Sequence, residues 1–417
     1  MATKILGLIM AGGKGTRLEP LTSDRAKPAV PFGGKYRLID FVLSNFVNSG
    51  LYSIYVLTQF MSQSLSDHLR DAWAFGTIQR EHFISMVPAQ MRLGESWYRG
   101  TADSVFQNMY LVEQHHPDLV AVFAGDHVYR MDVMQMIRYH QEREADLTVA
   151  VVPMPVEKAS DLGVVVVDDY WRIVGFQEKP SRPTPVPGNP HIALVSMGNY
   201  LFNRKTLQDV LDADAANSQS HHDFGHDVLP KVCRERAVFA YDFRRNRVPG
   251  TSPIEESYWR DVGTLDGYWE SHMDLRAVEP KFNLYNHEWP IRTADYWHPP
   301  AKFVHEVGDR VGRAINSVVT DGCIISGGTV RGSVLGRNVR VHSYSEVIDS
   351  VVLDNVEIGR GARVRRAIVD QDVVIAPEAS IGYNLTEDRL RFHVTDSGIV
   401  VISKGTRVTR ESTPIPV

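Results

Sequence analysis

Cysteine is scarce in this sequence: Cys233 and Cys323 are the only two among 417 residues. They lie far apart, in regions that we assign below to different domains, so the sequence predicts no structural disulfide. Two distant cysteines cannot build a Cys-based zinc site either. This usage is typical of proteins from a reducing compartment, and we expect a cytoplasmic protein.

Long hydrophobic runs and a positive net charge are also missing. The apolar stretch KILGLIM near the N-terminus ends at glycines followed by charge, without a convincing cleavage segment, so a buried strand is a better interpretation than a secretory peptide. Lys and Arg number 45 against 50 Asp and Glu, a formal net charge of −5, which argues against general nucleic-acid binding. We expect no membrane and no nucleic-acid partner.

The first 280 residues alternate short apolar runs with longer mixed segments, which predicts an α/β fold. Buried strands alternating with helices favour a mostly parallel sheet that is covered on both faces and binds ligands beyond the carboxyl ends of its strands. The predicted strands span residues 4–10, 53–59, 119–125 and 146–154, and the clearest helical patterns span residues 41–50 and 103–116.

The last hundred residues follow a different period, a repeat of 17 residues with an aliphatic side chain at steps of six, six and five. This spacing predicts a hexapeptide β-helix, left-handed in the known hexapeptide proteins, and makes an ordinary β-sandwich a poor alternative. Some acyltransferases use such a helix with a catalytic His, for which His342 is the only candidate inside the repeats. The positions expected to point inward are Val318, Ile324, Val330, Leu335, Val341, Val347, Val352, Ile358, Val364, Val369, Ile375 and Ile381.

These patterns divide the chain into residues 1–280, a catalytic domain, residues 281–305, an ordered linker, and residues 306–417, the β-helix domain. The length of the chain also favours two domains over one core. The linker is rich in proline and aromatic residues, so we expect it to pack on both domains rather than to act as a flexible tether.

A glycine-rich stretch follows the first predicted strand, AGGKGTRLEPLTSDRAKPAV from Ala11 to Val30. It is not a P-loop, because the upstream glycine falls on Leu8 and Gly15 replaces the Ser or Thr after Lys14. It is not a dinucleotide fingerprint, because the third glycine is replaced by Leu18. A plain turn is one alternative. The basic residues that follow favour a loop whose backbone N–H groups hold phosphate oxygens.

This stretch resembles the consensus of the sugar-nucleotide pyrophosphorylases, which join a nucleoside triphosphate to a sugar 1-phosphate. Further motifs in order, PFGGKYRLIDFVLSN, WYRGTADSV, FAGDHVYRMD, GFQEKP, SMGNYLF, HDFGHDVLPK, YWRDVGTLDGYW and WPIRT, are similar to those of the bacterial ADP-glucose pyrophosphorylases (glucose-1-phosphate adenylyltransferases). The resemblance covers nearly the whole chain. It implies a Rossmann-like nucleotidyltransferase domain followed by a left-handed β-helix, and a homotetramer that makes ADP-glucose for glycogen under the control of phosphorylated metabolites.

The implied chemistry brings two polyanions together, which requires a divalent cation, Mg²⁺, and fixed positive charge. The resemblance assigns Mg²⁺ to Asp126 and Asp261, although Asp126 alone could be a helix cap and Asp261 a partner of Arg260. Because the nucleophile is an anionic phosphate, no general base is needed, and we expect His127 to pack or to support its neighbours. The residues that the resemblance assigns to catalysis are Asp126, Arg17 and Lys27.

Two substrate sites follow from the same resemblance. Lys179 holds the phosphate of glucose 1-phosphate and Glu178 binds sugar hydroxyls, although EKP alone could be a solvated charge pair before a turn. The full sugar set is Tyr98, Gly163, Glu178, Lys179 and Ser196. The ATP set is Gly12, Gly13, Gly15, Thr16, Arg17, Gln90, Gly100 and Thr101.

Several charged clusters allow more than one interpretation. HH at residues 115–116 and SHHDFGHD at residues 220–227 could bind a metal, but a His-rich surface is the preferred interpretation. RVRR at residues 363–366 is solvated charge or an anion-binding surface. Arg25 and Arg37 are expected to bind an effector or merely to pair with nearby acids. Basic positions of the enterobacterial effector site are replaced by Asp24, Pro31, Gln114 and Gln371.

Overall fold

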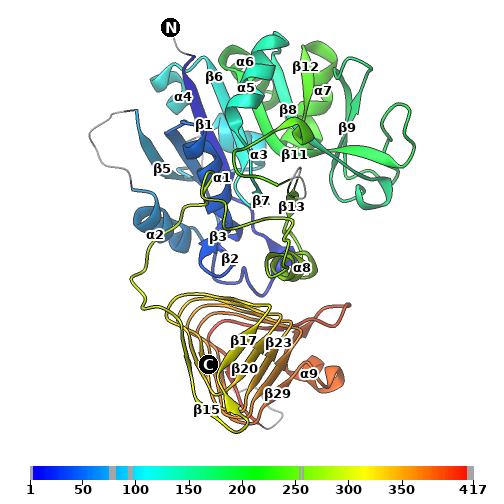
Figure 1. The fold of residues 1–417 in the computed structure, drawn as a ribbon. Coiled ribbons are helices and arrows are strands. Elements are labelled where there is room, and N and C mark those ends of the chain that lie inside the picture. Colours follow the sequence, from blue (N-terminus) through cyan, green and yellow to red (C-terminus); the bar gives the residue numbers. More distant parts are fainter. Residues whose placement is uncertain (1–2, 75–80, 93–96, 253–254, 256–257, 411–417) are drawn as a thin grey trace.

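The computed structural model describes residues 3–74, 81–92, 97–252, 255 and 258–410. A large α/β domain carries the N-terminus, and a triangular stack of short strands lies beneath it (Figure 1). Both cysteines are buried and free. Within the described residues, no helix has the length and apolar character needed to span a bilayer.

A mixed sheet forms the centre of the N-terminal domain, with the strand order β10-β9-β11-β6-β1-β4-β5, and β8 joins β11 to β12. The strands β6, β1, β4 and β5 run parallel, and β11 is antiparallel to β6, β8 and β9. The four predicted strands are confirmed as β1, β4, β6 and β8. The strands are β1 (Ile5–Ala11), β4 (Ser53–Thr58), β5 (Phe83–Pro88), β6 (Leu119–Ala124), β8 (Leu147–Pro155), β9 (Gly163–Val167), β10 (Ile173–Glu178), β11 (Ile192–Asn203) and β12 (Val238–Asp242).

Helices cover both faces of this sheet, as expected for strands that are apolar along their whole length. One core cluster packs α1, α2 and α5 on the sheet, and a second packs α3, α4, α6 and α7 on its other face. The helices are α1 (Leu38–Asn48), α2 (Gln63–Ala72), α3 (Thr101–Phe106), α4 (Met109–His115), α5 (Val133–Glu142), α6 (Arg204–Ala215), α7 (Leu229–Glu235) and α8 (Leu265–Leu275). A small hairpin pairs β2 (Pro31–Phe32) with β3 (Tyr36–Arg37), and a separate antiparallel pair joins β7 (His127–Tyr129) to β13 (Trp259–Asp261), which is distant in the sequence.

The helical pattern over residues 103–116 forms two helices rather than one. The break falls at Gln107 and Asn108, between α3 and α4. The Asn108 side chain donates to the carbonyl of Ser104 and to the hydroxyl of Tyr98, so it links the end of α3 to Tyr98 at the junction of the two helices. Side-chain to backbone bonds of this kind compete with helix continuation.

The strands of the C-terminal coils pair in parallel and stack into three sheets, which confirms the hexapeptide architecture, and among the strands described in these sheets only β30 is added in the antiparallel direction. Residues 17 apart face each other in the register, and the aliphatic positions from Leu335 to Ile381 that we expected to point inward are fully buried. The sheets contain β14 (Lys302–Val304), β19 (Ile324–Ser326), β22 (Arg340–Val341), β25 (Glu357–Ile358), β28 (Val374–Ile375) and β32 (Arg407–Val408); β17 (Arg313–Ile315), β20 (Thr329–Arg331), β23 (Glu346–Ile348), β26 (Arg363–Arg365) and β29 (Ser380–Ile381); and β18 (Val318–Val319), β21 (Val334–Leu335), β24 (Val351–Val352), β27 (Ala367–Val369), β31 (Val400–Ile402) and β30 (His393–Val394).

The first coil departs from the predicted phase by one residue. Val319 pairs with the inward-facing Leu335, and the fully buried Ile325 pairs with Val341, so our inward assignments of Val318 and Ile324 are wrong. At these two faces the step to the next coil is therefore 16 residues rather than 17.

The two parts of the chain share an apolar junction. One core cluster contains Phe32 and Phe41 of the N-terminal domain together with Leu353, Ile368 and Val401 of the β-helix. The β2–β3 hairpin and α8 lie along the face of the β-helix that is turned toward the N-terminal domain (Figure 1). The chain leaves the coils after β29 for α9 (Leu385–Arg391) and returns at β31, and another hairpin pairs β15 (Glu306–Val307) with β16 (Arg310–Val311).

Candidate active site

The glycine loop leaves the carboxyl end of β1 and leads into a single 3-10 turn at Thr16–Leu18. Gly15 has φ +67°, and a Cβ there would lie 3.0 Å from the Cβ of Lys27, so a larger residue is strained as well as crowded. In the described part of the chain, the N–H groups of Gly13, Lys14 and Gly15 donate to no protein acceptor. These groups are free to bind phosphate oxygens.

Four charged side chains converge beside this loop. The ammonium of Lys27 lies 2.8 Å from Asp126 Oδ2 and 3.0 Å from Asp261 Oδ1, and Arg17 lies 3.7 Å from Asp261 Oδ2. Asp126 follows β6, whereas Asp261 comes from β13, whose pairing with β7 sets it opposite His127. The structure thus brings together all three predicted catalytic residues and both predicted metal ligands.

The charges in this cluster are mutually stabilised. Burial opposes ionisation of Asp126, but the Lys27 ammonium and His127 outweigh it and lower the pKa of Asp126 to about 2. Burial likewise opposes ionisation of Asp261, and Lys27 again lowers its pKa. The pKa of Lys27 is raised, because the two carboxylates outweigh the burial of its ammonium. Both carboxylates are therefore ionised at neutral pH.

A cavity of about 230 Å³ lies over the glycine loop and the charge cluster. It is lined by Met10, Ala11, Gly13, Gly15, Thr16, Arg17, Lys27, Pro28, Asp126 and Gly263. Four of the predicted ATP residues thus line one cavity with Lys27 and Asp126. Gly12 lies at the edge of the loop, where a Cβ would stand 3.4 Å from the Cβ of Gln59.

His127 connects the charge cluster to strand β11. Its Nδ1 donates to the carbonyl of Met197 at 3.0 Å, and its Nε2 lies 3.6 Å from Asp126 Oδ1. Met197 belongs to an irregular stretch of β11 between Ser196 and Tyr200. This contact fixes the predicted sugar residue Ser196 near the charge cluster.

Glu178 and Lys179 lie at the end of β10. Glu178 pairs across the sheet with Gly163, and a Cβ on Gly225 would approach Glu178 Oε2 to 2.5 Å, so two glycines leave room for this carboxylate. Lys179 has φ +44° and a half-exposed side chain that lies 3.1 Å from Glu178 Oε1. The ammonium of Lys179 therefore faces open space beside Glu178.

The remaining predicted residues come from two segments. Tyr98 exchanges backbone hydrogen bonds with the Gln59 side chain, which also packs on Gly12, so Gln59 joins the glycine loop to the predicted sugar site. Gln90 follows β5 and is exposed. Thr101 donates to Asp223 Oδ2 at 2.9 Å.

Gly100 is a position of close approach. A Cβ there would lie 2.3 Å from the carbonyl of His222, on the loop that leads to the π-helical turn η4 (Phe224–Val228). Gly225 of this turn packs on Glu178, so the structure brings Gly100 and Thr101 to the Glu178 side of the site.

Comparison with known proteins identifies the family. A family model described as nucleotidyl transferase matches residues 6–278, and one described as the C-terminal hexapeptide of GlmU-like proteins matches residues 299–402. The glucose-1-phosphate adenylyltransferase of Thermus thermophilus is 56% identical over 410 residues, 97% of this chain and 99% of the relative. That of Deinococcus radiodurans is 52% identical over 411 residues, and glucose-1-phosphate adenylyltransferase 1 of Vibrio vulnificus is 50% identical over 404, with the same shares covered.

The chain belongs to the glucose-1-phosphate adenylyltransferase family. It is a nucleotidyltransferase, as the resemblance of its motifs predicted.

Arg25 of this chain lies in a buried ion pair between the two domains. Its Nη1 donates to Asp370 Oδ1 at 2.8 Å, and its Nε lies 3.3 Å from Asp24 Oδ1. Asp24 in turn pairs with Lys404 of the β-helix at 2.8 Å. Arg37 instead donates from Nη1 to the carbonyl of Ala29, at the start of α1.

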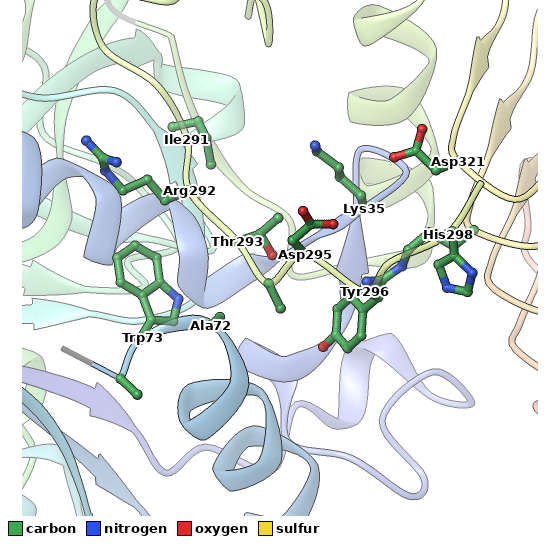
Figure 2. A pocket seen from close by; sticks show the side chains of 13 residues that line it. Lys35, Ala72, Trp73, Ile291, Arg292, Thr293, Asp295, Tyr296, His298 and Asp321 are labelled. Carbon is green, nitrogen blue, oxygen red and sulfur yellow. The ribbon is translucent and has the colours of Figure 1, made fainter. Parts of the chain in front are cut away.

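A larger cavity of about 630 Å³ lies between α2, the linker and the β-helix (Figure 2). Lys35, Asp295 and Asp321 point toward this space from three different segments, whereas the ring of Tyr296 points toward α2. This larger cavity shares no lining residue with the cavity over the glycine loop, so the volume of a cavity does not by itself identify the reaction site. The full lining is Lys35, Ala72, Trp73, Ala74, Ile291, Arg292, Thr293, Ala294, Asp295, Tyr296, His298, Asp321 and Arg337.

Sequence reasoning missed the residues that act on the site through packing. Gln59 stands one residue beyond β4, where a parallel sheet places functional groups, so its position was a usable signal. Gly263 admits Arg17 beside Asp261, since a Cβ there would lie 3.0 Å from the guanidinium. Gly263 is the glycine of the motif WRDVGT, but only the folded chain shows that its missing side chain makes room for Arg17.

Proposed function

We propose that the chain transfers the adenylyl group of ATP to α-D-glucose 1-phosphate and releases pyrophosphate. One observation carries this proposal: Lys27 joins Asp126 and Asp261 beside a glycine loop with free N–H groups. Relatives that share about half of its residues over nearly their whole length are named for this substrate and this group transfer.

Asp126 and Asp261 fit a magnesium site. Both are ionised, and both direct an oxygen to one cation, the Lys27 ammonium, which marks a point where positive charge is stabilised. Oxygen ligands from one or two carboxylates are what Mg²⁺ usually takes from a protein. When bound, Mg²⁺ would neutralise charge on the phosphate oxygens that must approach each other.

The remaining charges serve the triphosphate. The N–H groups of the glycine loop bind its oxygens, and Thr16 lines the same cavity. Arg17, whose side chain is half exposed, stabilises the leaving pyrophosphate, on which charge grows in the transition state. Lys27 is held rigidly by its two carboxylates, so its charge is already in place before substrate binds.

The acceptor lies on the other side of Asp126. Lys179 holds the phosphate of glucose 1-phosphate, and Glu178 accepts hydrogen bonds from sugar hydroxyls, with Tyr98, Gly163 and Ser196 around them. A phosphate oxygen of this sugar attacks the α-phosphorus of ATP, and the bond to the pyrophosphate oxygen breaks. Because the attacking oxygen is already anionic, the reaction needs no base.

Gln90, Gly100 and Thr101 bind the nucleotide base and ribose. These residues follow β5 and begin α3, at the edge where the parallel strands end. The competing function is a pyrophosphorylase for another base or sugar, and a third is a non-catalytic regulatory subunit. Retention of Asp126, Asp261 and Lys179 argues against the last, because a subunit without catalysis has no need of this charge cluster.

The deciding experiment measures pyrophosphate release by the purified chain with each of ATP, UTP, GTP, CTP and dTTP, and with glucose 1-phosphate against other sugar 1-phosphates. We expect ATP and glucose 1-phosphate to give the highest kcat/KM. A preference for another nucleotide would refute the adenylyl assignment, and no turnover with any pair would favour the regulatory subunit.

We further propose that the product serves glycogen or a related α-glucan, and that the enzyme is a cytoplasmic homotetramer controlled by a phosphorylated metabolite. Support for control comes from the junction. Arg337, which lines the larger cavity, pairs with Asp354, whose Oδ2 also accepts from Gln371. The neighbouring Asp370 pairs with Arg25, two residues before Lys27.

An anion bound at this junction can therefore bias the position of Lys27, since coupling requires only different affinities for two states. A monophosphate such as glucose 6-phosphate or fructose 6-phosphate fits better than fructose 1,6-bisphosphate, because Asp24, Pro31, Gln114 and Gln371 offer no positive charge for a second phosphate.

The regulatory test is a screen of sugar phosphates, pyruvate, phosphoenolpyruvate, AMP and inorganic phosphate on the native enzyme and on Arg37→Gln. Arg37 is the better target, because Arg25 is buried in an ion pair and its removal also affects stability. An effector response that Arg37→Gln weakens would support the site, whereas no response in the native enzyme would refute it.

A further inference from the structure

A cluster of metal-ligating side chains lies on the surface, outside the proposed mechanism. It consists of His221, on the loop after α6, and of His226 and Asp227, inside the π-helical turn η4. Both imidazoles are largely exposed, with side-chain accessibilities of 73% and 57%, while Asp227 is mostly buried at 11%. In the described part of the chain, this is the one group of three or more such residues with converging ligand atoms.

The distances suit ligands of one ion. The Nδ1 atoms of His226 and His221 lie 3.2 Å and 3.6 Å from the same oxygen, Asp227 Oδ1, and all three ligand atoms lie within 4.8 Å of one another. A tetrahedral ion with bonds of about 2.0–2.1 Å sets its ligand atoms about 3.3 Å apart. The separation of 3.6 Å is too long for a hydrogen bond, so hydrogen bonding alone does not explain why both rings face one oxygen.

The carboxylate is oriented for this task by the backbone. Asp227 Oδ2 accepts from the N–H of His221 at 3.2 Å and of Asp223 at 3.3 Å, which leaves Oδ1 to face the rings. Asp223 also caps the turn by accepting from the N–H of His226. Supporting bonds that fix the direction of a ligand are a usual feature of metal sites.

His222, which follows His221 directly, anchors the loop as well. His222 pairs with Asp214 of α6 at 2.8 Å, and its carbonyl accepts from the N–H of Ala102 at the start of α3. The backbone that carries His221 is thus tied to two helices. The two exposed rings need only side-chain rotation to bring their nitrogens closer together.

We propose that His221, His226 and Asp227 bind a divalent transition ion of the zinc class, at a surface site separate from the proposed magnesium site. Two imidazoles exclude Mg²⁺ and Ca²⁺, which take oxygen ligands. Two histidines and a carboxylate are a common zinc set, and Ni²⁺ and Cu²⁺ favour the same ligands. Water completes the coordination shell. The proposal does not rest on the proposed function.

The test titrates Zn²⁺ into the full chain by calorimetry in a buffer with excess Mg²⁺. We compare the native chain with His221→Gln/His226→Gln and with His287→Gln, a control at another exposed histidine. We expect the native chain and the control to bind one zinc ion more than the double variant. Each single variant, His221→Gln or His226→Gln, should bind that ion about tenfold more weakly or worse.

A second probe reports the ligands directly. Co²⁺ bound by the native chain should give the intense visible absorption of a tetrahedral site, and the double variant should lose it. Because both rings are exposed, circular dichroism should show an unchanged fold in all variants. Equal zinc stoichiometry and affinity in the native chain and the double variant would refute the site, as would cobalt spectra that do not differ.

Discussion

His272 of α8 is a buried histidine that the fold holds in the neutral form. Its Nε2 accepts from the N–H of Gly33 at 3.1 Å, and its Nδ1 donates to the carbonyl of Tyr268 at 2.8 Å. Protonation would add a second N–H that points at the N–H of Gly33. Burial lowers the pKa of His272 to about 4, although its bond to the Tyr268 carbonyl opposes this shift.

The size of the effect follows from linkage. A pKa that falls from 6.5 in the unfolded chain to about 4 in the folded one corresponds to about 3 kcal/mol. Between these values the unfolded chain binds a proton that the folded chain does not. The free energy of unfolding should therefore carry this contribution fully above pH 6.5 and lose it as the pH falls toward 4.

The assay is urea unfolding at intervals from pH 7.5 to pH 4.5, on the native chain and on His272→Gln. Glutamine keeps one donor and one acceptor, so it can serve both bonds but has no proton to gain. Other buried groups, such as His140, whose pKa burial also lowers, change both proteins alike. We expect the native chain to lose about 2 kcal/mol or more relative to the variant over this range. Parallel pH profiles for the two proteins would refute the reasoning.

Three further predictions concern the site and the junction. Asp126→Asn should lower kcat about 10²-fold or more while the fold persists, because one well-placed charge is lost; the exposed Asp169→Asn is the control, and near-native turnover at saturating Mg²⁺ would count against the metal role. Lys179→Gln should raise the KM for glucose 1-phosphate far more than that for ATP, whereas equal increases would make Lys179 structural. Arg25→Met should lower the free energy of unfolding by about 3–5 kcal/mol by leaving Asp370 buried without its partner; Arg25→Met/Asp370→Leu should recover much of this loss, and equal losses in urea unfolding would contradict the buried pair.

The β-helix was predictable because its geometry imposes a strict rule. Each turn must place one aliphatic side chain inside at each face, so the period is written directly in the sequence. The prediction failed in the first coil, where Val318 is followed by Val319 and Ile324 by Ile325. Both members of each pair satisfy the rule, and only the stacking on Leu335 and Val341 chooses between them.

The residues of the candidate site could be named from the sequence to the extent that they lie on motifs at strand ends. The convergence of Lys27, Asp126 and Asp261 depends on three segments far apart in the chain, and the motifs supplied the residues without their distances. Gln59 was missed although its position directly after β4 was a usable signal, and Gly263 was missed because its contribution is a contact across the fold. Patterns within one segment carry no record of such contacts.

The histidines of SHHDFGHD also show that sequence spacing does not determine which side chains meet. In the sequence, a run with three histidines is usually a solvated surface, and that was the preferred interpretation. The fold separates them: His222 turns inward to Asp214, while His221 and His226 turn outward to share Asp227. Spacing alone could not distinguish these roles, because the π-helical turn changes which side chains meet.

The junction ties the β-helix to the segment that carries Lys27. Lys27 must hold its charge between two carboxylates, and the segment that carries it is fixed two residues earlier by Arg25 to Asp370 of the β-helix. Arg25 Nη2 and Asp370 Oδ2 are buried without partners in the described structure, so this pair is less than fully satisfied. The β-helix thus contacts the segment that leads to Lys27, and it contributes no side chain to the cavity over the glycine loop.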